Sequence, residues 1–247
     1  MKKLAAALGL AGLFCLLPPA GMAADYLEEP VSNGGAITGR VTLTGRDRAP
    51  RIYKIYKDNQ VCGDGAHEFD FVKVVNGALQ NVVVYLDDIQ AGKPWPADIG
   101  QGAIVQKACE FKPFLGVMRR GAGLRVVNDD PIEHNVNAYE LANNRMYTEF
   151  KVDQPRQGSV IKKLRLKHGG VGMKIECNAH DFMHSYVFVA PNPYFAVVKE
   201  DGSFEITDVP PGKYRIRAWH GFLRDLEAEV EVTAGATARV DFQFKGR

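Results

Sequence analysis

The stretch VGMKIECNAHDFMHSYVFVA, residues 171–190, contains two apolar β-type segments separated by a short polar loop. The first segment ends at Cys177, and the second covers residues 186–190; both are rich in β-branched, aromatic and other apolar residues, as strands are. The loop between them carries a thiol, an imidazole and a thioether, each three residues after the last, at Cys177, His180 and Met183. The stretch therefore predicts two β-strands joined by a loop of potential metal ligands.

Short β-type segments occupy most of the chain on both sides of this stretch. Residues 37–43 alternate apolar and polar side chains, the period of a half-buried strand, and residues 81–86 form an apolar run typical of a buried strand. Turn-forming residues separate the later segments, as at 201–202 and 210–212. No segment has the apolar period of an amphipathic helix of three turns or more. We therefore expect an all-β chain that forms sandwiches or barrels.

A thiolate, imidazoles and a weakly bound thioether are the ligands that suit a redox-active copper ion. The second imidazole has to come from another part of the chain, and His134 is the candidate because it begins a predicted strand directly after a turn. The sequence thus points to one copper ion bound by His134, Cys177, His180 and Met183. Zinc is a lesser alternative, since it binds cysteine and histidine but seldom methionine. Another alternative is that these residues hold no metal and that Cys177 is either disulfide-bonded or a buried free cysteine.

His184 is an alternative fourth ligand, because it follows Met183 directly. Adjacent residues on a strand point to opposite sides, so both side chains cannot easily bind one ion. We favour Met183.

Residues 103–190 resemble the cupredoxin family, with a ligand loop of the amicyanin type. The resemblance lies in Cys-x-x-His-x-x-Met followed by an apolar strand, and in Asn128, six positions before His134. It implies a Greek-key β-sandwich, a mononuclear type 1 (blue) copper site and electron transfer. It also implies that Asn128 ties the two ligand loops together and hydrogen-bonds near the sulfur, and that electrons leave through the ring of His180.

Residues 35–45 and 201–214 resemble the carboxypeptidase regulatory-like, or transthyretin-like, β-sandwich, through a Gly-x-Val strand, a Gly-x-Phe strand and a Pro-Pro-Gly-x-Tyr hairpin. The two halves are far apart in the sequence. We therefore expect residues 35–97 plus 191–245 to form one sandwich, with the cupredoxin-like domain, residues 98–190, inserted into it or joined to it. The alternative is a series of three small consecutive units.

The first 24 residues have the features of a cleaved signal peptide: two lysines, an apolar run too short to span a bilayer, and small residues at the end. This predicts export to the periplasm, or beyond it to the cell surface or medium. No later segment is apolar enough for a membrane anchor. Of the four cysteines, Cys15 lies in this signal. If Cys177 binds a metal, Cys62 and Cys109 are left to form a disulfide in the oxidising compartment.

Without the two lysines of the signal, basic and acidic side chains are equal in number, which gives no support for nucleic acid or membrane-surface binding. A basic run spans residues 162–167, where alternation along a predicted strand at 161–166 places Lys163, Arg165 and Lys167 on one face. Such a face is most often simply solvated, but it also suits docking of an acidic redox partner.

Hydrolase, nucleotide-binding and metalloprotease motifs do not occur in the sequence, so we expect an electron carrier rather than an enzyme. The expected partner is a c-type cytochrome or a dehydrogenase, for example in methylamine utilisation. The alternative function is a non-redox envelope module, binding or structural, whose cupredoxin fold stores copper or is metal-free. The sequence does not determine the oligomeric state.

Overall fold

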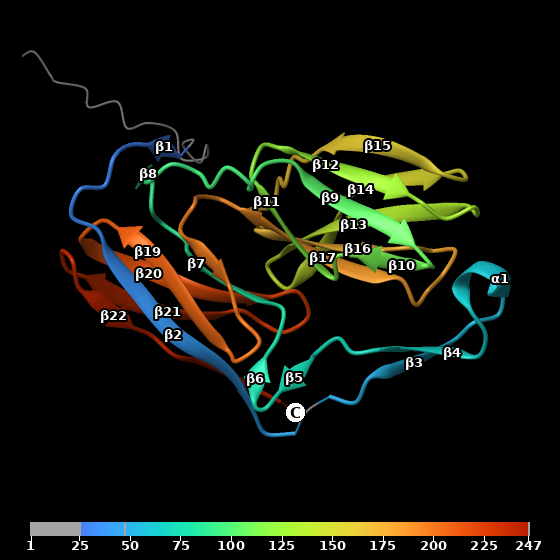
Figure 1. The fold of residues 1–247 in the computed structure, drawn as a ribbon, viewed down its shortest axis with the longest axis horizontal. Coiled ribbons are helices and arrows are strands. Elements are labelled where there is room, and N and C mark those ends of the chain that lie inside the picture. The colour runs from blue at the N-terminus through green and yellow to red at the C-terminus, as the bar shows by residue number, and fades with distance from the viewer. Residues whose placement is uncertain (1–25, 47, 247) are drawn as a thin grey trace, which may run out of the picture.

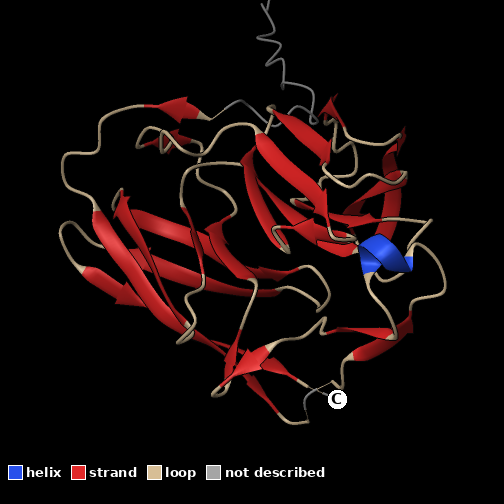
Figure 2. Cartoon of the chain, turned by 45° about the vertical axis from the view of Figure 1, so that its right-hand side comes forward, coloured by secondary structure: helices blue, strands red, loops and turns tan. Residues whose placement is uncertain are grey.

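The computed structural model describes residues 26–46 and 48–246. Nearly every element in this part of the chain is a β-strand, and the single helix described there, α1 (Asn59–Cys62), has four residues. The predicted all-β class is confirmed (Figure 2). The predicted signal peptide, with Cys15, lies outside the described residues. Within the described ranges, no helix has the length and apolar character needed to cross a membrane.

The strands between residues 102 and 190 form two sheets around one apolar core, which we call the central sandwich (Figure 1). One sheet has the order β10-β9-β12-β15 and the other β11-β17-β16-β13-β14. Each sheet contains one parallel pair, β9 with β12 and β11 with β17. The strands are β9 (Gly102–Lys107), β10 (Glu110–Lys112), β11 (Leu115–Arg119), β12 (Gly123–Asn128), β13 (His134–Ala142), β14 (Arg145–Gln154), β15 (Gly158–Lys163), β16 (Gly172–Glu176) and β17 (His184–Ala190).

Strands from both ends of the described chain form a second pair of sheets, the flanking sandwich (Figure 1). Early strand β2 pairs with late strands β19, β22 and β23, and early strand β7 pairs with β18 and β20. Both chain segments are thus needed to complete each sheet; that the central sandwich folds by itself stays a prediction. The strands are β2 (Gly35–Thr44), β5 (Val74–Val75), β6 (Ala78–Leu79), β7 (Val82–Leu86), β18 (Phe195–Val197), β19 (Ser203–Val209), β20 (Gly212–His220), β21 (Leu226–Val232), β22 (Thr237–Arg239) and β23 (Phe242–Lys245), beside a small pair, β1 (Leu27–Glu28) with β8 (Ala91–Gly92).

Strand β17 joins the two sandwiches, and all seven of its residues are buried. Val187 and Val189 belong to the core of the central sandwich, whereas Phe188 belongs to the core of the flanking one. Phe188 packs on Trp219 of β20 with ring centroids 5.5 Å apart. Gly172 of β16 leaves room for the same indole, since a Cβ there would overlap it. Burial on both faces accounts for the apolar sequence of β17.

A segment of residues 51–69, which we call the strap, runs along the outside of the central sandwich (Figures 1 and 2). It consists of β3 (Arg51–Lys54), α1 and β4 (Ala66–Phe69), and β3 pairs with β4. Cys62 of α1 forms a disulfide with Cys109, in the turn between β9 and β10. Ile55 and Cys62 lie in the core of the central sandwich. The strap, expected within the flanking domain, therefore packs on the central sandwich through Ile55 and Cys62, while Phe69 packs against the flanking core.

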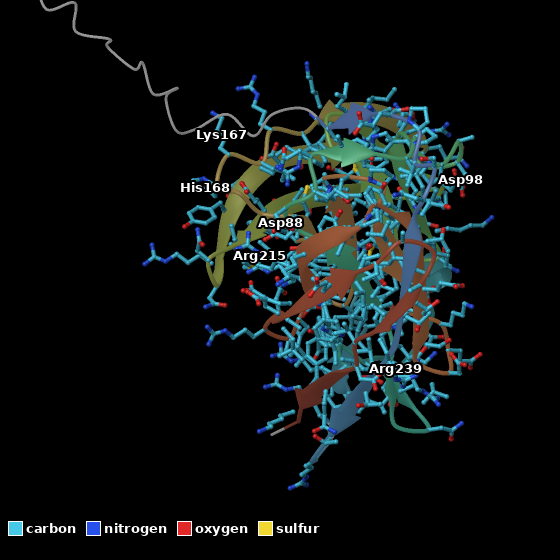
Figure 3. The ribbon with its side chains drawn as sticks, turned by 90° about the vertical axis from the view of Figure 1, so that its left-hand side faces the viewer. Asp88, Asp98, Lys167, His168, Arg215 and Arg239 are labelled. Atoms are coloured by element: carbon cyan, nitrogen blue, oxygen red, sulfur yellow. A yellow bond between two sulfur atoms is a disulfide. The ribbon has the colours of Figure 1, made fainter. Side chains whose placement is uncertain are left out.

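The strand expected over residues 161–166 lies earlier, since β15 ends at Lys163. Leu166 is buried and has a φ of 36°, which does not fit an extended strand. Arg165 and Lys167 therefore do not continue one strand face with Lys163, and that expectation is wrong. Figure 3 shows Lys167 and His168 at the edge of the molecule, in the turn that follows.

Candidate metal centre

Three of the predicted ligand residues, His134, Cys177 and His180, lie together at one end of the central sandwich. His134 is the first residue of β13, and Cys177 follows the last residue of β16. These strands are antiparallel neighbours, with Asn137 opposite Glu176, so the beginning of one lies beside the end of the other. Strand register thus brings His134 to the loop that carries the other two.

The side chains of these residues turn three potential ligand atoms toward one another. Nδ1 of His134 lies 3.0 Å from Nδ1 of His180, and Sγ of Cys177 lies 3.9 Å from each. A point in the plane of these atoms about 2.3 Å from the sulfur lies about 2.0 Å from each nitrogen, the usual metal–sulfur and metal–nitrogen bond lengths. These three atoms would therefore hold one metal ion, and a thiolate with two imidazoles is a donor set that suits copper.

Asp130 fixes the orientation of His134. Its carboxylate accepts hydrogen bonds from Nε2 of His134 at 2.8 Å and from the backbone N–H groups of Ala108 and Cys109 at 2.7 and 2.9 Å. Burial opposes ionisation of Asp130, but these hydrogen bonds outweigh it and lower the pKa of its carboxyl group. Burial also lowers the pKa of His134, so we assign a neutral ring with its proton on Nε2. Nδ1 then presents a lone pair toward Cys177.

Asp58 of the strap has the same relation to His180, whose Nε2 donates to Oδ2 of Asp58 at 2.9 Å. Metal-binding histidines commonly donate their second N–H to a carboxylate in this way. The two Nδ1 atoms, 3.0 Å apart, can share one proton in the metal-free protein, and a bound metal ion would take the place of that proton. His180 is only 2% exposed beneath the strap, and electron exit through its ring stays a prediction.

Asn135, directly after His134, connects the two ligand segments. Its Oδ1 accepts hydrogen bonds from the N–H groups of Asn178 and Ala179 at 2.7 and 3.3 Å, and lies 3.6 Å from Sγ of Cys177. Burial raises the pKa of the Cys177 thiol, so a metal ion is needed to stabilise the thiolate. Sequence reasoning missed Asn135. The available signal was a short amide side chain at the start of a strand, where it can hold the N–H groups of a neighbouring loop.

Asn128 holds the turn before His134 rather than the sulfur. Its Nδ2 donates to the carbonyls of Ile132 and Pro155 at 2.8 and 3.0 Å, and its Oδ1 accepts from the N–H of Asp130 at 3.0 Å. The predicted contact near the sulfur is wrong, because the side chain is directed into this turn and toward the end of β14. Its influence on the site passes through Asp130.

Met183 is 1% exposed and belongs to the same core as Cys177. Its N–H donates to the carbonyl of His180 at 3.0 Å, and its carbonyl accepts from the N–H of Cys177 at 3.3 Å. These bonds hold the first and last residues of the ligand loop side by side. Met183 as the axial ligand stays a prediction.

His184 points into the strap instead. Its Nε2 lies 3.1 Å from the hydroxyl of Tyr53, and its ring packs on Phe69 and Phe71, with centroids 5.0 Å away in each case. Burial lowers the pKa of His184 to about 4. The alternative fourth ligand is therefore engaged elsewhere, where it anchors the strap.

A comparison with protein-family models matches residues 190–240 to domain II of polysaccharide lyase family 4. This segment lies mostly in the flanking sandwich, for which a carboxypeptidase regulatory-like domain was expected. The match corrects that expectation. The carboxypeptidase regulatory-like expectation rested on short strand and hairpin motifs, and many β-sandwich families share such local turns.

Among solved structures, the chain is similar to copper proteins of the cupredoxin type. A purple cupredoxin from Nitrosopumilus maritimus is 17% identical, and the match covers 37% of this chain and 99% of that one, with a TM-score of 0.30. Amicyanin from Paracoccus versutus is 16% identical, covering 45% and 99%, with a TM-score of 0.27. A reduced amicyanin variant is 14% identical, covering 38% and 86%, with a TM-score of 0.29. No curated protein matches the chain.

Proposed function

We propose that this protein holds one copper ion in a type 1 site and uses it to transfer electrons. One observation carries the proposal. The Nδ1 atoms of His134 and His180 and the Cys177 sulfur face one another at distances that suit ligands of one metal ion, while the Nε2 of each ring is hydrogen-bonded to a carboxylate. Both rings are thereby oriented with their lone pairs toward the sulfur. This is the donor set of a trigonal copper site, and the buried Met183 would complete it.

Bound copper would supply the chemistry, a one-electron change between Cu(I) and Cu(II). The chain's own contribution is to hold the ligands in place. Asp130 and Asp58 orient the two rings by accepting hydrogen bonds from their Nε2–H groups, and Asn135 accepts hydrogen bonds from the segment that follows Cys177. Because strand pairing and these bonds position the ligands in advance, they have little need to move when the oxidation state changes.

The visible and EPR spectra of the Cu(II)-loaded protein test this proposal. We expect an intense thiolate-to-copper band and narrow hyperfine splitting, both lost in Cys177→Ala. His180→Gln should also lose the type 1 spectrum, whereas the matched control His168→Gln, at an exposed histidine that stacks on Tyr147 and belongs to none of the candidate ligand groups, should keep it. A colourless protein, or a spectrum that Cys177→Ala does not change, would rule the copper site out.

The proposed setting is the periplasm, because the sequence begins like a signal peptide and the structure contains a disulfide. There the protein would exchange electrons with a c-type cytochrome or a dehydrogenase, acting as a carrier and not as an enzyme. Stopped-flow mixing of the reduced protein with candidate cytochromes measures this exchange directly.

A second candidate function is a non-redox envelope module that stores copper. It is favoured by the covering of His180, since the strap separates this ligand from the surface. Voltammetry of the copper-loaded protein distinguishes the two. A reversible one-electron wave supports electron transfer, whereas bound copper without such a wave supports storage.

A further inference from the structure

The Cys62–Cys109 disulfide lies directly beside the metal centre. Its two sulfur atoms and a ring nitrogen of His180 lie within 4.8 Å of one another. The sulfur of Cys109 also forms such a group with Asp130 and His134. The disulfide therefore borders both of the proposed histidine ligands.

The two cysteines come from separate parts of the fold. Cys62 ends helix α1 in the strap, whereas Cys109 lies in the turn between β9 and β10. Other contacts also hold the strap in place: His67 stacks on Phe182 of the ligand loop with ring centroids 5.3 Å apart, and Asp58 is hydrogen-bonded to His180. Opening the disulfide would thus loosen the strap without detaching it, and both sulfurs would stay beside His180.

We propose that reduction of this disulfide creates a second metal site, in which the thiolates of Cys62 and Cys109 bind Cu(I) beside His180. Thiolates are soft ligands that select Cu(I). An incoming dithiol supplies two electrons and two protons: the S–S bond breaks, two protein thiols form, and the dithiol itself becomes a disulfide. One Cu(I) then displaces the two thiol protons. The proposal rests on the proposed function for its choice of copper.

The position of this second site gives it a role in loading the first. Cu(I) held by Cys62 and Cys109 lies beside His180, which also belongs to the set with Cys177. The cysteine pair is thus placed to receive Cu(I) and deliver it to the buried centre. Once Cu(I) has left and the two thiols have regained their protons, an oxidising disulfide accepts two electrons and two protons from them and becomes a dithiol, and the Cys62–Cys109 bond forms again and holds the strap over His180. The two cysteines thus bind Cu(I) as thiolates and hold the strap to the central sandwich as a disulfide.

Anaerobic titration of the full chain with Cu(I), in competition with bicinchoninate, tests the proposal. The titration is done on the oxidised protein and on protein that a phosphine has reduced, after removal of the phosphine. Thiol titration should show two additional thiols after reduction. We expect the reduced protein to bind one additional equivalent of Cu(I). Cys177→Ala should keep this additional equivalent, because it removes only the first site. Cys62→Ser and Cys109→Ser should each abolish it.

Two additional thiols without an additional Cu(I) would overturn the proposal, as would an additional equivalent that survives in Cys62→Ser. A disulfide that the phosphine cannot reduce in the folded protein would overturn it too. Circular dichroism checks that each variant is folded, and the comparison of oxidised with reduced wild type needs no variant. Absence of the blue Cu(II) spectrum would count against the proposed function but not against this gain of Cu(I), so the two failures are distinguishable.

Discussion

Asp58 accepts a hydrogen bond from Nε2 of His180 at 2.9 Å, although 122 residues separate them in the sequence. The carboxylate comes from the strap and the ring from the ligand loop. The side chain of His180 is 1% exposed, whereas that of Asp58 is 37% exposed. Water therefore reaches the carboxylate and not the ring, so a change at Asp58 acts on a ligand from outside without altering the ligand set.

Replacing Asp58 by asparagine should raise the reduction potential of bound copper. The substitution keeps the shape of the side chain but removes a negative charge that favours Cu(II). Because Asp58 is partly exposed, we expect an effect of about 1 kcal/mol, or roughly 40 mV. Spectroelectrochemical titration measures it, with Asp64→Asn on the same strap as a control that leaves the potential unchanged. A potential that stays the same or falls in Asp58→Asn contradicts the prediction.

Replacing Asn135 by alanine should both destabilise the metal-free protein and change the copper spectrum. The N–H groups of Asn178 and Ala179 lose their acceptor, at a cost of about 1–2 kcal/mol. Without these hydrogen bonds the segment that follows Cys177 is less rigidly positioned, so the thiolate-to-copper band should shift or weaken. Urea denaturation and visible spectra measure the two effects. Asn128→Ala is the comparison: it should lower the stability but change the band less, and equal changes in the band would mean that Asn135 has no special role.

Removing the disulfide should lower the stability of the metal-free protein by about 2–4 kcal/mol, because the bond closes a loop spanning 47 residues. Urea denaturation of Cys62→Ser/Cys109→Ser under oxidising conditions measures this loss. Cys177→Ser is the control, since that cysteine is free and its replacement opens no loop. A double variant as stable as the wild type would show that the disulfide does not restrain the strap.

His220 should make the folded protein less stable in mild acid. Burial lowers its pKa from 6.5 to about 4, and its Nδ1 accepts hydrogen bonds from the N–H groups of Phe222 and Leu223 at 3.2 and 3.1 Å, which protonation would break. The unfolded chain takes up this proton near pH 6.5 and the folded chain only near pH 4. Stability that is present above pH 6.5 is therefore lost as the pH falls toward 4, by about 2 kcal/mol at pH 5.

Urea denaturation at pH 7 and pH 5 checks the effect of His220 by comparing the wild type with His220→Asn. The asparagine keeps an acceptor for the two N–H groups but does not titrate in this range. We expect a smaller fall in stability for this variant. Equal falls in the two proteins would show that His220 does not contribute.

Local patterns were enough to predict the all-β class, most of the strands and the ligand loop, although the strand expected over residues 161–166 ends at Lys163. The alternation over residues 37–43 and the apolar run over residues 81–86 depend only on neighbours in the chain, and both segments are strands in the structure. The spacing of Cys177, His180 and Met183 is equally local. The odd number of cysteines left Cys62 and Cys109 as a pair once Cys177 was assigned to a metal, and the structure contains that disulfide.

Spacing was a poorer guide to the direction of side chains. Asn128 lies at the interval that the family resemblance requires, yet it bonds within the turn before His134. Asn135, which carries no such signature, lies against the sulfur. In a turn, the backbone conformation decides where a side chain points, and the interval to a ligand does not encode it.

Only the tertiary structure decided how the centre is enclosed. The predicted Cys62–Cys109 pair joined one residue of the strap to the central sandwich, but no pattern indicated that Asp58 would meet His180. Strand periodicity records which residues face a core, because every second side chain is buried. A hydrogen bond between polar groups far apart in the chain leaves no such period, so the packing of the strap on the central sandwich determines which carboxylate reaches which ring.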